Sequence, residues 1–169
     1  MSDIADPNQP EITTAEVPDP QAEAQIERIE EEFEASGTLV GIIMGSKNDM
    51  EKMLPAQKYL SEQSIKSEVH VMSAHRDPEK VREYCQNARM NGLKVIIAGA
   101  GMSAALPGVA AAHTDLPVIG VPLTSRLSAM GGLDALLSIA QMPPGVPVAC
   151  VGLDNARNAG HLAARILAA

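Results

Sequence analysis

The fold of this protein is decided by LVGIIMGSKND at residues 39–49, where a continuous apolar run ends in a glycine and a polar turn. Such a run predicts a short β-strand that is buried on both faces. The hydroxyl, amide and carboxylate side chains that follow Gly45 favour the start of a helix. The sequence has five strand candidates of this kind: Leu39–Met44, Glu68–Met72, Val95–Ala98, Val118–Val121 and Val148–Val151.

Helical patterns follow these runs, at about residues 48–63, 77–91, 102–113, 131–140 and 154–168. Strands that alternate with helices indicate a parallel sheet covered on both faces. Because crossovers between parallel strands are right-handed, we expect an α/β fold: a three-layer α/β/α sandwich around a doubly wound parallel sheet, flavodoxin-like or Rossmann-like. Such sheets bind ligands at the carboxyl ends of their strands, so the turns after the strands are the place to look for chemistry.

Charge divides the chain near residue 36. Residues 1–36 hold 11 of the 21 acidic residues and, among the 13 basic ones, only Arg28. We expect this N-terminal extension to be disordered or to contain a marginal helix over residues 21–35; the alternative is a helix that docks on the domain or on another subunit. Residues 37–169 are expected to form a single domain, with 12 basic and 10 acidic residues. That balance provides no basic stripe for nucleic acid, but it suits a small anionic ligand.

Cysteine content and hydropathy narrow the class of protein further. Cys85 and Cys150 are the only cysteines and lie far apart, which indicates reduced thiols and a cytoplasmic protein. No stretch reaches the roughly 18 apolar residues that a membrane helix needs. The acidic, proline-containing N-terminus is unlike a signal or transit peptide. We therefore expect no membrane partner.

Polar residues follow the first predicted strand. Ser46, Asn48 and Asp49 stand at a helix start, where backbone N–H groups and the helix dipole favour an anion such as phosphate. The same residues also make an ordinary strand-to-helix turn with a helix cap. The spacing is not that of a P-loop. Taken alone, this turn leaves both interpretations open.

The second predicted strand ends in Ser73-Ala74-His75-Arg76-Asp77-Pro78. Asp77 as a helix cap and Pro78 at the first helical position explain the helix start. They do not explain the residues before them. Arginine offers phosphate a planar fork of donors, and histidine exchanges protons near neutral pH. We therefore interpret His75 and Arg76 as functional residues.

Small residues follow the third predicted strand, in the run Gly99-Ala100-Gly101-Met102-Ser103-Ala104-Ala105-Leu106. They allow the backbone to approach a ligand closely, and they equally allow a helix to pack tightly on the sheet. After the fourth strand, Thr124-Ser125-Arg126 is a candidate pocket wall or lid. The four histidines and the carboxylates show no metal-ligand spacing, so we expect no metal site.

Six motifs carry a resemblance that covers about residues 38–169. They are Met44-Gly45-Ser46-Lys47-Asn48-Asp49, Ser73-Ala74-His75-Arg76, Ala98-Gly99-Ala100-Gly101, Leu106-Pro107-Gly108, Pro117-Val118-Ile119-Gly120-Val121-Pro122 and Ser138-Ile139-Ala140-Gln141-Met142-Pro143. In this order they closely resemble the class I PurE family, the N5-carboxyaminoimidazole ribonucleotide mutases. The resemblance implies an isomerase of de novo purine biosynthesis that converts N5-carboxyaminoimidazole ribonucleotide (N5-CAIR) to 4-carboxyaminoimidazole ribonucleotide (CAIR). It also implies a cytoplasmic homo-octamer that handles carbon dioxide and needs no cofactor.

The resemblance also assigns roles to individual residues. His75 would be the general acid and base, and Arg76 would hold the phosphate. The remaining predicted substrate-binding residues would contact the ribonucleotide or line the pocket for the base and carbon dioxide: Ser46, Asn48, Asp49, Ser73, Gly99, Ala100, Gly101 and Leu106.

The main departure from the family pattern is Ala105, which stands where a second histidine is usual, in a Gly-Ala-Ala-His-Leu-Pro-Gly stretch. His113 is a candidate replacement. In having alanine at this position, the sequence is similar to the class II relatives, which carboxylate aminoimidazole ribonucleotide (AIR) directly. Arg76, in contrast, favours class I, because class II usually has lysine there. Three alternatives stay open: a direct AIR carboxylase, a carboxylating enzyme for a pyridine nucleotide, and an inactive nucleotide-binding relative.

Overall fold

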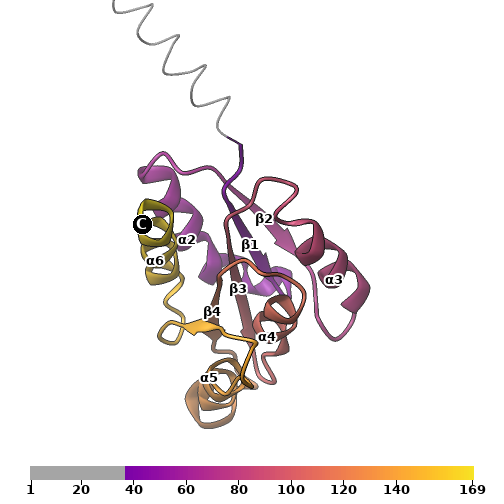
Figure 1. The fold of residues 1–169 in the computed structure, drawn as a ribbon. Helices are drawn as coiled ribbons and strands as arrows, with labels where there is room; N and C mark the ends of the chain where they lie inside the picture. The colour runs from indigo at the N-terminus through magenta and orange to yellow at the C-terminus, as the bar shows by residue number, and fades with distance from the viewer. Residues whose placement is uncertain (1–36) are drawn as a thin grey trace, which may run out of the picture. The chain divides into compact units, whose positions relative to one another are not determined.

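The structure is a computed structural model that describes residues 37–169; the predicted N-terminal extension, residues 1–36, lies outside the described residues. The described part contains a five-stranded, all-parallel sheet of order β2-β1-β3-β4-β5 (Figure 1). The strands are β1 (Val40–Met44), β2 (Ser67–Val71), β3 (Val95–Gly101), β4 (Val118–Leu123) and β5 (Ala149–Cys150). The helices are η1 (Lys47–Asp49), α2 (Met50–Glu62), α3 (Pro78–Asn87), α4 (Ala105–Ala112), η2 (Ala129–Gly132), α5 (Leu133–Ala140) and α6 (Ala156–Ala168).

Helices cover both faces of the sheet, so the predicted three-layer, doubly wound α/β sandwich is confirmed (Figure 1). Successive residues of β1 enter opposite cores because side chains alternate along a strand. Ile42 packs with buried residues of α2 and α6, whereas Ile43 packs with buried residues of α3, α4 and α5. Both isoleucines are fully buried, as expected for a central parallel strand.

Every predicted strand and helix within residues 37–169 is present, with shifts at the ends. The largest shift is at the end of α3, which stops at Asn87 and not at the predicted residue 91. The helix predicted to begin at residue 102 begins at Ala105 instead. Met102 has a φ of 56°, in the left-handed region, so the chain turns there before the helix starts. β3 in turn extends through Gly101, beyond the predicted end at Ala98.

The strand order places a topological switch point between β1 and β3. After β1 the chain crosses to β2 on one side, and after β2 it returns to β3 on the other side of β1. In open α/β sheets the crevice outside the carboxyl ends of such strands is where ligands bind. The turns after β1, β2 and β3 therefore meet at this edge. No helix within residues 37–169 is both long and apolar enough to cross a membrane.

Candidate active site

The turn after β1 forms the first wall of a cavity at this switch point. Ser46 has extended backbone angles, and its hydroxyl accepts a hydrogen bond from the Asn48 amide at 3.2 Å, which caps η1. Asp49 faces the cavity beside Ser46. Asn48 itself is exposed and is not among the residues that line the cavity. Ser46 and Asp49 are thus brought to the cavity, and Asn48 contributes its backbone to the cap.

The surroundings of Asp49 shift the pKa of its carboxyl group. Burial raises the pKa of its carboxyl above the ordinary value of 3.8, although a backbone hydrogen bond at Ser46 and the charges of Lys52 and Arg76 act in the opposite direction. A partly desolvated carboxyl group in a cleft accepts hydrogen bonds from ligand hydroxyl groups well, because few water molecules compete for it.

The turn after β2 contributes Ser73, His75 and Arg76 as a second wall. Ser73 is buried, and its carbonyl oxygen accepts a hydrogen bond from the Asp77 amide at 2.8 Å, which closes the turn. The Arg76 guanidinium donates to the carbonyl oxygen of Gly45 at 2.7 Å, so this side chain bridges the turns after β2 and β1. One donor is used in this way, and the remaining guanidinium N–H groups are available to an anion.

His75 also lines the cavity, and its side chain is exposed. Within residues 37–169, its imidazole has no hydrogen bond or ion pair to another protein group. This absence distinguishes it from His70, which contacts Glu68 at 3.3 Å, and from His161, which stacks on Tyr59. An imidazole with no partner in the described part of the chain is free to exchange a proton with a ligand.

The third wall is the end of β3 and the start of α4. Ala100, Gly101 and Leu106 line the cavity, as predicted, and Met102 and Ser103 join them. A Cβ on Gly101 would lie 2.8 Å from the Leu123 carbonyl oxygen, so close packing with β4 requires glycine there. Gly99 does not line the cavity: a Cβ at Gly99 would meet the Met53 sulfur at 2.3 Å, on the face of the sheet that α2 covers.

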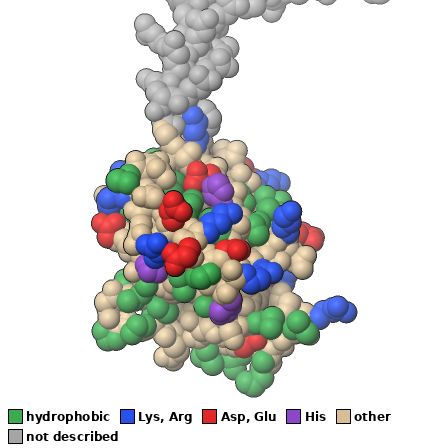
Figure 2. All heavy atoms as spheres, turned by 90° about the vertical axis from the view of Figure 1, so that its right-hand side faces the viewer, with side chains coloured by type: hydrophobic (Ala, Val, Ile, Leu, Met, Phe, Trp, Pro, Cys, Tyr) green, Lys and Arg blue, Asp and Glu red, His purple; other side chains and the backbone are tan. Residues whose placement is uncertain are grey.

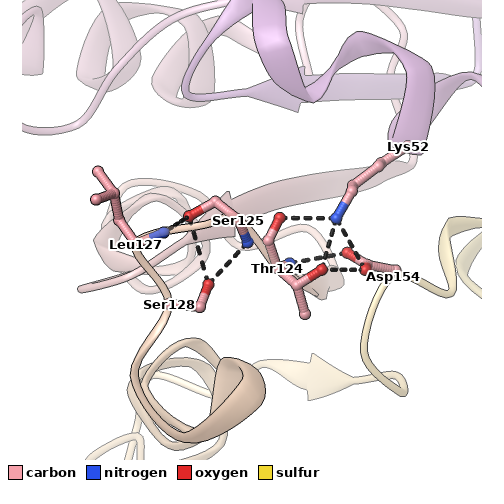
Figure 3. A network of polar contacts seen from close by, with 6 residues as sticks. All are labelled: Lys52, Thr124, Ser125, Leu127, Ser128 and Asp154. Carbon is pink, nitrogen blue, oxygen red and sulfur yellow. Dashed lines mark hydrogen bonds and ion pairs between the residues drawn. The ribbon is translucent and has the colours of Figure 1, made fainter.

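Two cavity residues come from the end of β4, where the sequence predicted a pocket wall or lid. Thr124 and Ser125 line the cavity, and Arg126 does not. The hydroxyl of Ser125 accepts a hydrogen bond from the Leu127 amide at 3.1 Å, and its backbone amide donates to the Ser128 hydroxyl at 2.8 Å (Figure 3). These bonds give the segment a defined turn.

Ala105 faces the cavity at the first position of α4, so the residue that replaces the usual histidine of the family lies at the site. The suggested replacement, His113, does not reach it. α4 starts at the carboxyl edge of the sheet and runs back toward the start of β4, and His113 stands at the far end of that helix. Among the histidines of residues 37–169, only His75 lines the cavity.

Together these walls enclose a cavity of about 380 Å³. This volume is within the range of small-molecule sites. Eight of the ten predicted site residues line it: Ser46, Asp49, Ser73, His75, Arg76, Ala100, Gly101 and Leu106. Missing from the predicted site residues were Gly45, Ala74, Met102 and Ala105, which stand directly beside predicted residues, and Ser103, which stands two positions after Gly101. Within residues 37–169, no cluster of three or more histidine, cysteine, aspartate or glutamate side chains is arranged to hold a metal ion.

The sequence profile of the AIR carboxylase family matches residues 39–169. The chain belongs to this family. Among relatives in the AIR carboxylase family, the N5-carboxyaminoimidazole ribonucleotide mutase of Pyrococcus abyssi is 56% identical over 128 residues, which cover 76% of this chain and 72% of that protein. The mutase of Bacillus subtilis is 56% identical over 133 residues, which cover 78% of this chain and 81% of that protein.

A solved structure of the same family agrees. The crystal structure of Treponema denticola PurE superposes with a TM-score of 0.68 at 30% sequence identity, over 77% of this chain and 80% of that chain. The predicted resemblance to the PurE family is therefore confirmed at the level of sequence and of fold.

Proposed function

We propose that this protein is an N5-carboxyaminoimidazole ribonucleotide mutase, an isomerase that converts N5-CAIR to CAIR in purine biosynthesis. The observation that carries the proposal is the identity of more than half of the aligned residues to mutases over most of the domain. The cavity at the switch point supports it, because it combines an anion-binding arginine, an unpartnered imidazole and small-residue walls. We propose that residues 37–169 form a single mutase domain.

In this proposal the ribonucleotide lies across the switch point. Arg76 binds the phosphate with the guanidinium donors that Gly45 does not use, and the hydroxyl of Ser46 adds a further contact. Asp49 accepts hydrogen bonds from ribose hydroxyls. The aminoimidazole ring then points toward His75, between Ser73 and the end of β3. In this proposal Asn48 acts through its backbone amide in the cap, and Gly99 acts by leaving room for Met53 to pack against the sheet.

His75 supplies the proton transfers of the reaction. The N5–carboxylate bond breaks, its electron pair stays on N5, and the imidazolium of His75 protonates that nitrogen as carbon dioxide leaves. Carbon 4 of the electron-rich ring then attacks the carbon dioxide and forms the new C–C bond. The now neutral imidazole removes the proton from carbon 4, which restores the aromatic ring and returns His75 to its starting state. Atoms and charge balance without an additional reagent.

The walls of small side chains hold the carbon dioxide between cleavage of the N5–carboxylate bond and formation of the bond to carbon 4. Ala74, Ala100 and Ala105 line the cavity beside His75 and offer no nucleophile that competes with carbon 4. Confinement keeps carbon dioxide next to the ring, and proximity of this kind is a large term for a molecule that would otherwise diffuse away.

We further propose a cytoplasmic homo-octamer. The two cysteines are unpaired, which suits a reducing compartment. Large apolar side chains are exposed near the end of the sheet that carries α5: Leu127 at 75% and Met130 at 78%. The lower end of the surface in Figure 2 is accordingly rich in apolar side chains, as expected for a face that contacts other copies of the chain. Analytical ultracentrifugation tests the octamer.

The deciding experiment follows the carbon in solution. Purified protein is given N5-CAIR labelled with ¹³C in its carbamate, without ATP, and ¹³C spectra follow the transfer of label to carbon 4. Rapid conversion with most of the label retained supports the mutase. Turnover only when AIR and bicarbonate are supplied would assign direct carboxylation instead. Ribonucleotide binding without either reaction would assign an inactive relative.

A further inference from the structure

Three residues that are far apart in the sequence meet behind the cavity: Lys52 of α2, Thr124 at the end of β4 and Asp154 before α6 (Figure 3). The Lys52 ammonium donates to the Thr124 carbonyl oxygen at 2.7 Å, to the Thr124 hydroxyl at 2.6 Å and to an Asp154 oxygen at 2.9 Å. Asp154 also accepts from the Thr124 amide at 2.8 Å and from the Thr124 hydroxyl.

The number of donors determines what Lys52 can do. An ammonium group has three N–H donors, and all three are used within this cluster. Lys52 therefore has no donor left for a substrate. Burial opposes ionisation of Asp154, but hydrogen bonds from Thr124 and Lys52 outweigh it and hold the pKa of that carboxyl below its usual value. The Asp154 carboxyl is therefore ionised at neutral pH.

The cluster acts on the cavity through Thr124. The amide, carbonyl and hydroxyl groups of this residue are all bonded to Lys52 or Asp154, although Thr124 itself lines the cavity. Its methyl group also contacts the start of α5: a Cβ on Gly132 would lie 2.9 Å from it. The segment between them, residues 125–131, is mostly exposed and includes left-handed residues at Met130 and Gly131. The other hydrogen bonds of this segment lie within residues 125–128 or join Ala129 and Met130 to the start of α5, so Thr124 is its attachment beside the cavity.

We propose that Lys52 and Asp154 are positioning residues that anchor Thr124 and Ser125 as the fourth wall of the ribonucleotide site. The inference rests on the proposed function, since it names the same cavity as the binding site. Without the anchor, the segment from Thr124 to Gly132 samples positions away from the cavity. Substrate binding then has to order it again, so the affinity falls while the proton transfer at His75, on another strand, keeps its rate.

The test uses the variant Lys52→Met, with Lys58→Met as the matched control because Lys58 is exposed on the same helix. Asp154→Asn provides a second route, because asparagine tolerates the left-handed conformation of this position, with a φ of 52°. Hydrogen exchange followed by mass spectrometry reads the mobility of residues 123–132. Titration with CAIR measures the dissociation constant of the site, and steady-state kinetics with N5-CAIR measure KM and kcat.

We expect Lys52→Met to speed amide exchange about tenfold in residues 123–132 alone, to raise the dissociation constant and KM about tenfold and to leave kcat within about threefold. Lys58→Met should match the wild type. The double variant of Lys52 and Asp154 should be no worse than either single variant, since both act through Thr124.

Three results would overturn the inference: unchanged exchange in residues 123–132, faster exchange there with unchanged CAIR affinity, or faster exchange in every peptide of the chain. The last would make the cluster a general stabiliser. Exchange and CAIR binding are measured without turnover. A wild-type protein that binds CAIR but does not isomerise N5-CAIR would refute the proposed function and leave this comparison decisive.

Discussion

Replacing Arg76 with methionine removes the guanidinium group but keeps an apolar side chain similar to the stem of arginine, so it measures the contribution of the charged group. The guanidinium has five N–H donors. One of them donates to the Gly45 carbonyl oxygen at 2.7 Å, so a bidentate contact to the substrate phosphate remains possible. Hydrogen bonds to charged groups contribute about 1.5–3 kcal/mol each, and water competes at this exposed position. We therefore expect a loss of about 2–4 kcal/mol in binding, which is roughly 30- to 700-fold in the dissociation constant.

Isothermal titration with CAIR and with the corresponding nucleoside, which lacks the phosphate, measures this loss directly. The wild type should prefer the nucleotide strongly, and Arg76→Met should bind both ligands with similar, weak affinity. Arg82→Met is the control, because Arg82 pairs with Glu79 on the exposed side of α3. If Arg76→Met still prefers the nucleotide as strongly as the wild type does, the phosphate lies elsewhere and the placement of the substrate is wrong.

Three further substitutions test the walls of the cavity. Gly101→Ala forces a Cβ to within 2.8 Å of the Leu123 carbonyl oxygen, so we expect destabilisation by about 1–3 kcal/mol in urea unfolding together with weaker CAIR binding. The methyl group of Gly99→Ala meets the buried side chain of Met53 instead, so this variant should unfold more easily, while the folded protein binds CAIR with unchanged affinity. Weaker CAIR binding without a loss of stability would show that Gly99 contacts the substrate. Asp49→Asn should raise the melting temperature at pH 7, because the folded-state pKa of this carboxyl is raised and its ionisation opposes folding. That gain should vanish as the pH falls below about 3.8, and a gain that grows toward acid would contradict it.

Much of the fold follows from local sequence patterns. The apolar runs predicted all five strands, because strands buried on both faces of a parallel sheet need such runs. The start of α4 was placed three residues early, because small residues such as Ala104 suit a helix, and no local signal reveals the left-handed turn at Met102. β5 is also shorter than its apolar run, with only Ala149 and Cys150 in the ladder.

The candidate site was predictable where its residues follow strands directly. Ser46 and His75 reach the cavity for that reason. The orientation of Gly99 was not predictable, since it depends on Met53 filling the space above it. Nor was the pairing of Lys52 with Asp154, which joins residues 102 positions apart in the sequence. Such contacts depend on how separate elements pack, and no spacing rule within one element carries that information.

The proton transfer assigned to His75 is the central claim, and one rate measures it. The conversion of N5-CAIR to CAIR at saturating substrate is compared between the wild type, His75→Asn and His113→Asn, whose histidine lies at the far end of α4. We expect His75→Asn to lose about 10²–10⁴-fold in kcat, to retain its fold by circular dichroism and to bind CAIR, whereas His113→Asn should turn over at the wild-type rate. A correctly folded His75→Asn protein with a kcat close to that of the wild type would contradict this claim.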